Sequence, residues 1–71
     1  MTTSFRLAQN KLATLVKARR VVLGISQEEL AHQAGIDRTY ASQIERGIGN
    51  PSLKVICALA DALKIETKEL I

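Results

Sequence analysis

The stretch SQEELAHQAGIDRTYASQIERG, residues 26–47, reads as two short helices joined by a tight turn. Ser26, followed three residues later by Glu29, is a capping box that begins the first helix. Gly35 ends that helix, and Asp37 is the N-cap of the next one. Two helices joined by a short glycine-containing turn form a helix-turn-helix, so this unit decides the expected fold.

The helix that follows Asp37, which we expect to run roughly to Arg46, has two distinct faces. A rotation of about 100° per residue places its aliphatic side chains on one side and a polar stripe on the other. Arginine suits guanine, glutamine suits adenine, and serine or threonine suits either base, so the stripe could read base-pair edges. An ordinary solvated face is the alternative, but the stripe lacks the Lys–Glu pairs that such faces usually carry. The polar stripe consists of Arg38, Thr39, Ser42, Gln43 and Arg46.

The residues on either side of this unit predict three further helices and no strand. Apolar residues recur at helical spacing over residues 5–23 and again over residues 52–63, and a last short helix begins near Thr67. We therefore expect a single all-α domain, residues 1–71. Its fold is predicted to be a compact five-helix bundle around the helix-turn-helix core, residues 26–46.

Composition restricts the classes of function. The net charge of +3 and the pI of about 9.4 favour polyanionic partners, though only modestly. Cys57, the only cysteine, lies in an apolar run, which predicts a buried and reduced thiol. The sequence has no metal-ligand set, phosphate-binding loop or nucleophile–base pair, so we expect no catalysis, no metal and no cofactor. It has no membrane-spanning run or signal peptide, which predicts a cytoplasmic protein.

The motifs SQEELA, AG, YxSQIERG and NPSL, within residues 23–53, resemble the Cro/CI-type, or Xre-type, helix-turn-helix regulators of bacteria and phages. The DRTY start of the second helix is most similar to the controller proteins of restriction–modification systems. The resemblance implies a lambda-repressor-like DNA-binding domain with its recognition helix in the major groove. The chain departs from the family pattern at Ala41, where a larger aliphatic residue is common.

The resemblance also implies roles for individual residues. Arg20 and Glu45 would form an ion pair that ties the first helix to the recognition helix, which explains an arginine on an otherwise apolar helix face. The implied base contacts are Arg38, Thr39, Ser42 and Gln43, and the implied phosphate contacts are Gln27, Tyr40, Arg46 and Asn50.

One recognition helix covers only a few base pairs, so we expect a homodimer on a near-palindromic operator in double-stranded DNA. We expect no effector domain and no small-molecule effector, and we favour autoregulation by protein concentration. An antitoxin-type protein that binds a toxin as well as its own promoter is the alternative function. The candidate dimer residues lie in the last two helices, although they could instead complete the core of one chain: Val55, Leu63, Ile65, Leu70 and Ile71.

Overall fold

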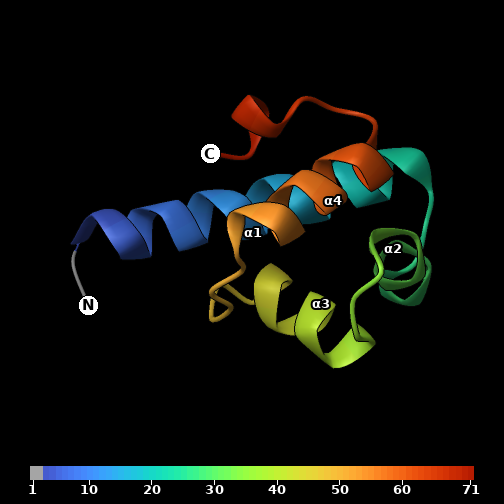
Figure 1. Ribbon diagram of the computed structural model, residues 1–71, viewed down its shortest axis with the longest axis horizontal. Coiled ribbons are helices and arrows are strands. Elements are labelled where there is room, and N and C mark those ends of the chain that lie inside the picture. The colour runs from blue at the N-terminus through green and yellow to red at the C-terminus, as the bar shows by residue number, and fades with distance from the viewer. Residues whose placement is uncertain (1–2) are drawn as a thin grey trace.

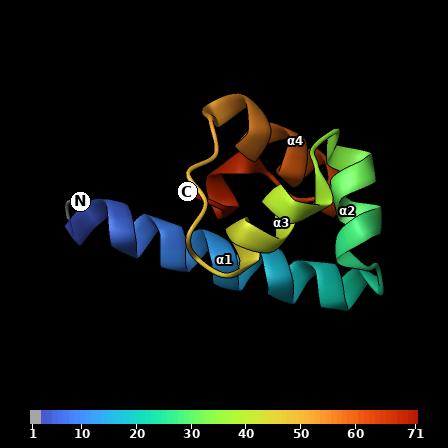
Figure 2. The same ribbon diagram turned by 90° about the horizontal axis from the view of Figure 1, so that it is seen from below.

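The computed structural model describes residues 3–71 as four α-helices and one 3₁₀ turn, with no strand in that range. In Figure 1 the long helix α1 lies behind α4, and α2 and α3 lie below these two helices. The view from below in Figure 2 shows α3 between α1 and α4. The elements are α1 (Thr3–Leu23), α2 (Gln27–Ala34), α3 (Arg38–Glu45), α4 (Leu53–Leu63) and η1 (Thr67–Glu69).

The expected fifth helix is wrong, because the segment after α4 makes only one 3₁₀ turn, η1. Glu69 accepts a hydrogen bond from the backbone N–H of Glu66 at 2.8 Å, which closes the turn on itself. Thr67 lies inside this turn and does not cap it. The turn serves to return Leu70 to the core, where that side chain is 1% exposed.

The N-terminal ends of α2 and α3 form where the sequence predicts them. The Ser26 hydroxyl accepts the N–H of Glu29 at 3.0 Å, and the Asp37 carboxylate accepts the N–H of Thr39 at 3.0 Å. The predicted capping box is only half formed, because the Glu29 carboxylate accepts a hydrogen bond from Gln33 at 2.9 Å instead of returning to the cap. The caps nevertheless fix the starts of both helices of the helix-turn-helix.

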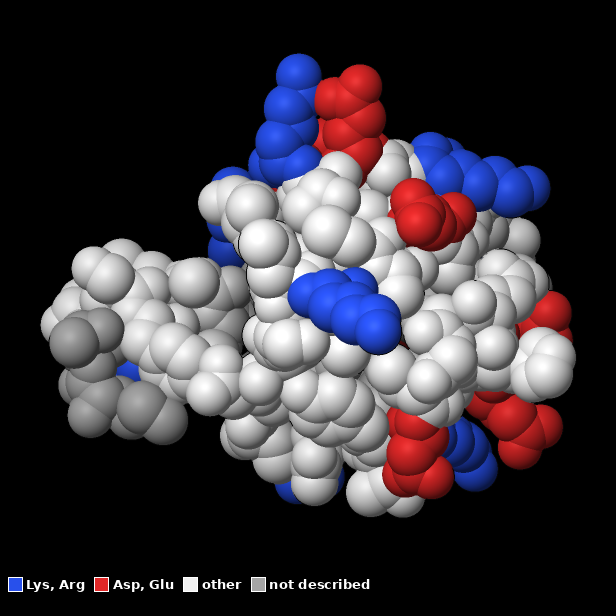
Figure 3. Space-filling model, in the orientation of Figure 1, with Lys and Arg blue, Asp and Glu red and all other residues white. Residues whose placement is uncertain are grey.

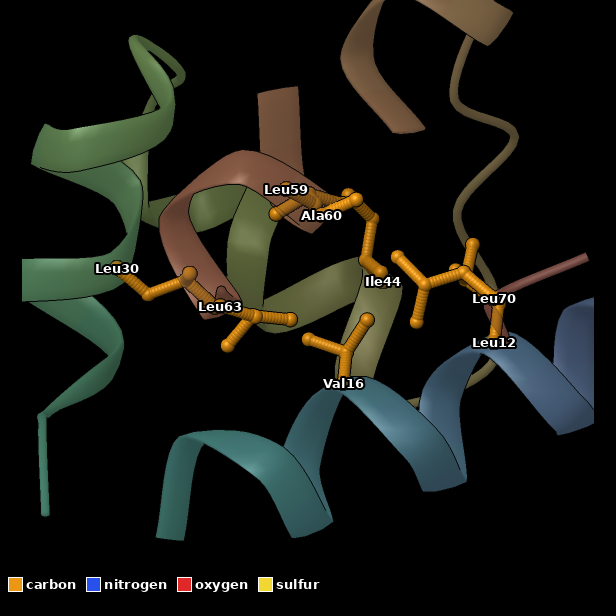
Figure 4. Packing of buried hydrophobic residues seen from close by; sticks show 8 residues of the cluster. All are labelled: Leu12, Val16, Leu30, Ile44, Leu59, Ala60, Leu63 and Leu70. Atoms are coloured by element: carbon orange, nitrogen blue, oxygen red, sulfur yellow. The ribbon is translucent and has the colours of Figure 1, made fainter. Parts of the chain in front are cut away.

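One aliphatic cluster, shown in Figure 4, holds the four helices together. Leu30, Leu59 and Leu63 are each 0% exposed, and Ile44 fixes α3 against them at 2%. Burying a leucine or isoleucine side chain contributes roughly 1.5–3 kcal/mol each. The cluster consists of Leu12, Val16, Leu30, Ile44, Leu59, Ala60, Leu63 and Leu70.

Two of the residues expected at a dimer surface belong to this core instead. Leu63 and Leu70 are 0% and 1% exposed in a single chain, so neither has surface to offer a partner. Val55 and Ile65 are half-buried and pack against the cluster, whereas Ile71 is 61% exposed. Helical spacing identifies an apolar face, but it does not say whether the same chain already covers it. The thiol of Cys57 is likewise half-buried and not fully buried as expected.

The last residue of the α4 region, Lys64, has a backbone conformation that favours glycine. Ser52 begins α4 as predicted, and Lys64 ends it with φ of 60°, in the left-handed region. We expect Lys64→Gly to raise the free energy of unfolding by about 0.5–1 kcal/mol, because the steric cost of a side chain there disappears. Urea denaturation followed by circular dichroism measures this change.

The control for Lys64→Gly is Gly24→Ala, because Gly24 has a φ of 70° and open space around the position of an added Cβ. It should destabilise the protein by about 1 kcal/mol through backbone strain alone. A lower free energy of unfolding in Lys64→Gly would contradict this. It would show that the contacts of the lysine side chain stabilise the protein by more than the left-handed backbone conformation destabilises it.

Candidate nucleic-acid interface

The polar stripe of α3 faces away from the core. Arg38 and Thr39 are exposed and Ser42 and Gln43 are half-buried, whereas the opposite side of α3 is buried through Ala41 and Ile44. Within residues 3–71, none of these four polar side chains takes part in an intramolecular hydrogen bond. Their donors and acceptors are therefore available to an external partner. The two-faced helix agrees with the sequence prediction, and contacts with individual bases remain a prediction.

The residues expected to hold phosphates lie around this stripe, at the start of α2, within α3 and just after α3. Gln27 is the first residue of α2, and Tyr40 is half-buried with its ring against the core. Arg46 ends α3, and Asn50 lies in the loop that follows; both are exposed. Free backbone N–H groups at the start of α2 add to the favourable environment for an anion.

The expected ion pair between Arg20 and Glu45 is present. Arg20 Nε lies 2.7 Å from Glu45 Oε2, Nη2 lies 3.0 Å from Oε1, and Nη1 donates to the carbonyl of Ile25 at 2.9 Å. The Arg20 side chain is 15% exposed and that of Glu45 only 2%. Hydrogen bonding to Glu45 raises the pKa of Arg20 above its usual value, so the guanidinium keeps its charge. This pair fixes the end of α3 against α1 and against the turn before α2.

Sequence reasoning missed a third donor to the same carboxylate. The side-chain amide of Gln27 donates to Glu45 Oε1 at 3.2 Å. The start of α2 therefore lies beside the last turn of α3, and Gln27 retains a second N–H and its amide oxygen for a phosphate. No local signal predicts this bond, because it depends on the angle between the two helices.

A second contact that the sequence did not predict fixes the loop between α3 and α4. Gln9 Nε2 donates to the carbonyl of Gly49 at 2.6 Å, which ties the loop to α1. Gly49 is buried, and a Cβ built on it would lie 2.9 Å from Ile44 Cγ1 and 3.2 Å from the Ile44 backbone. The loop therefore holds Asn50, its neighbour, in a defined position beside the end of α3.

The part of the chain that the structure describes gives no support for a metal site or a membrane-spanning segment. It brings together no group of three or more His, Cys, Asp or Glu side chains that could hold a metal ion. None of its helices has both the length and the apolar character needed to cross a membrane.

The fold and the exposed α3 stripe define a helix-turn-helix protein. A family model described as Helix-turn-helix (HTH_3) matches residues 16–70. The chain belongs to this family, which confirms the resemblance seen in the sequence motifs.

Relatives of known name include restriction-modification controllers. The controller protein C.AhdI from Aeromonas hydrophila is 43% identical, and its structure superposes with a TM-score of 0.84 over 89% of this chain and 96% of that one. The control protein C.BamHI of Bacillus amyloliquefaciens is 41% identical over 58 residues, 78% of this chain and 72% of that protein. The controller C.Esp1396I, 30% identical with a TM-score of 0.77 over 89% of this chain and 93% of that one, forms a tetramer in complex with its natural 35 base-pair operator.

Other relatives are longer. This chain spans 41% of the length of two uncharacterized HTH-type transcriptional regulators of Mycobacterium tuberculosis, to which it is 32% identical over 57 residues.

Proposed function

We propose that this protein is a sequence-specific DNA-binding transcriptional regulator that acts as a homodimer on a near-palindromic operator. The observation that carries the proposal is the exposed stripe of α3, whose base-reading side chains have no partner within residues 3–71. α3 would lie in the major groove, and the start of α2 and the loop after α3 would hold phosphates on either side.

The finer proposal is an autoregulatory controller of a restriction–modification operon. Its support is the similarity to the controllers C.AhdI and C.BamHI over most of the chain. The antitoxin alternative has no comparable support, because the relatives described above are controllers and transcriptional regulators. In a restriction–modification operon, the protein would bind the promoter upstream of its own gene.

Selection from a pool of random-sequence duplexes tests the DNA-binding proposal, because the protein itself picks out its operator from the pool. We expect enrichment of a sequence with two related half-sites whose centres are about 34–36 Å apart, one turn of B-DNA. A pool that stays random after repeated rounds, while the protein remains folded, would contradict the proposal.

Arg38→Ala should weaken binding to the selected operator by about 1–3 kcal/mol and relax the preference at one base pair, because arginine reads guanine through two hydrogen bonds. Fluorescence anisotropy titrations with operator and random duplexes measure both effects. Arg6→Ala, which removes an exposed arginine near the far end of α1, is the matched control and should change affinity little. Equal losses on both duplexes would assign Arg38 to a phosphate.

Gln27→Ala should weaken binding to operator and random DNA alike, by about 1 kcal/mol, because a phosphate contact carries no sequence information. The salt dependence of binding should stay unchanged, since the lost group is neutral and releases no counterion. Gln33→Ala, at the exposed other end of α2, is the control. A loss confined to the operator would reject the phosphate role.

A further inference from the structure

The positive charge of this chain is concentrated on α1. Five of the chain's ten Lys and Arg residues lie in this helix, and none of its seven Asp and Glu residues does. The rest of the chain therefore has five cations against seven carboxylates. In Figure 3, where α1 lies behind α4, Lys and Arg lie beside Asp and Glu on the near face. α1 is thus the element that attracts phosphates most strongly, although the expected base contacts lie on α3.

Two of the five cations of α1 are used inside the molecule. Arg20 pairs with Glu45, and Arg19 Nε donates to the carbonyl of Leu63 at 2.9 Å, at the end of α4. The others are exposed and form no ion pair within residues 3–71, so they are available to an anion. These three are Arg6, Lys11 and Lys17.

Lys17 lies on the side of α1 that adjoins the end of α3. Thr14, Lys17 and Val21 are exposed, and they line one hollow together with Glu45, the last residue of α3. The view from below in Figure 2 shows this length of α1 beside α3, with no other helix in front of the two. A duplex that receives α3 in its major groove therefore passes close to Lys17.

The other two available cations lie elsewhere. A rotation of about 100° per residue places Lys11 about 120° from Lys17, on a stripe with Leu15 and Val22. Those two residues line a different hollow, formed with Ile65 after α4. Arg6 lies about 16 Å further along the helix axis than Lys17, at the end of α1 that extends beyond α3 in Figure 1. Of the three cations, only Lys17 adjoins the expected DNA surface.

The carboxylate of Glu45 does not oppose an anion at this hollow. The Glu45 side chain is 2% exposed, and its charge is paired with the guanidinium of Arg20. The amide of Gln27, an expected phosphate contact, donates to the same carboxylate at 3.2 Å. Gln27 and Lys17 therefore lie on two sides of one buried, neutralised group, and both reach solvent beside the end of α3.

We propose that Lys17 binds a backbone phosphate of the DNA, next to the phosphate expected at Gln27. The DNA interface then extends from α2 and α3 onto α1. The lysine ammonium is a point charge with three donors on a flexible stem, which suits a phosphate. Because it replaces a counterion, Lys17 contributes to the salt dependence of binding, which the uncharged Gln27 does not. The inference rests on the proposed function for the DNA itself.

The salt dependence of DNA binding tests the assignment, with fluorescence anisotropy titrations of operator and random duplexes at several salt concentrations. One phosphate contact contributes about −0.9 to the slope of log K against log salt concentration, or roughly eightfold in affinity at about 0.1 M salt. Lys17→Gln should therefore reduce the steepness of the slope by about 0.9 and raise the Kd roughly eightfold on both duplexes. A phosphate contact carries no sequence information, so the two duplexes should respond alike.

Lys11→Gln is the matched control, because it removes the same charge from the same helix on a side that does not adjoin α3. It should leave the slope and the Kd nearly unchanged, and Lys17→Arg, which keeps the charge, should retain both values. Circular dichroism checks that each variant is folded.

Three results would overturn the assignment of Lys17 to a phosphate. The first is an unchanged slope in folded Lys17→Gln. The second is an equal change in Lys11→Gln, which would mean that both lysines act only through long-range attraction. The third is a loss confined to the operator. A chain that selects an operator but shows any of these results would keep the proposed function and lose the inference.

The random duplex separates the opposite case. A chain that binds it through Lys17 but selects no sequence would keep the inference and lose the proposed function. A chain that binds neither duplex would overturn both.

Discussion

Arg20→Met is expected to lower the free energy of unfolding by about 3–5 kcal/mol, which is comparable to the whole stability of a domain of this size. The reason is the environment of Glu45, whose side chain is 2% exposed and receives both Nε and Nη2 of Arg20. Without the guanidinium, the carboxylate stays buried with only the amide of Gln27 as a side-chain donor. Urea denaturation at neutral pH measures the loss.

The double variant Arg20→Met, Glu45→Met should be much more stable than the sum of its two single variants predicts, because it leaves no uncompensated charge in the interior. The control is Lys68→Met, which breaks an exposed ion pair to Glu66 at 3.2 Å and should have little measurable effect. Additive losses in the double variant would show that Arg20 and Glu45 act independently, contrary to the geometry.

Leu59→Ala is expected to destabilise the protein by about 2–5 kcal/mol, the range for removing a buried leucine and leaving a cavity. Leu59 is 0% exposed and belongs to the cluster that joins α4 to the other helices. The cluster around Leu59 is closely packed with aliphatic side chains, so we expect them to fill the gap only in part. The measurement is the shift in the midpoint of urea denaturation, with the dependence of the free energy of unfolding on urea concentration unchanged.

Leu53→Ala is the matched control for Leu59→Ala, since it makes the same chemical change in the same helix at a residue that is 64% exposed. It should change the free energy of unfolding by less than about 0.5 kcal/mol. Equal losses in the two variants would mean that α4 does not pack through the face described.

Local signals predicted the parts of the fold that depend on local chemistry. Ser26, Asp37 and Ser52 each cap a helix where expected, because a cap needs only its own side chain and the next turn. The fifth helix failed because the short segment around Thr67 suits a single turn as well as a helix. The helix caps and the turn at Thr67 are each decided by interactions among a few neighbouring residues.

Contacts between distant elements were predicted less well. The Arg20–Glu45 pair came from a family resemblance, and the bonds from Gln27 to Glu45 and from Gln9 to Gly49 had no sequence signal. These bonds depend on the angles at which the helices cross, and the spacing of apolar residues along the sequence does not predict those angles. For the same reason Leu63, an apolar residue at helical spacing, could not be assigned to the core or to a dimer surface from the sequence alone.

Backbone amide chemical shifts, recorded while the isotope-labelled protein is titrated with the selected operator duplex, test the central claim most directly. The account predicts that the largest changes fall at the start of α2, along α3 and in the loop at Asn50, with little change at Val22, which lies on the face of α1 that lines a hollow with Ile65 and Glu69. Val22 is 71% exposed, so DNA could reach it. Large changes on that face of α1 with none along α3 would contradict the claim that α3 reads the operator.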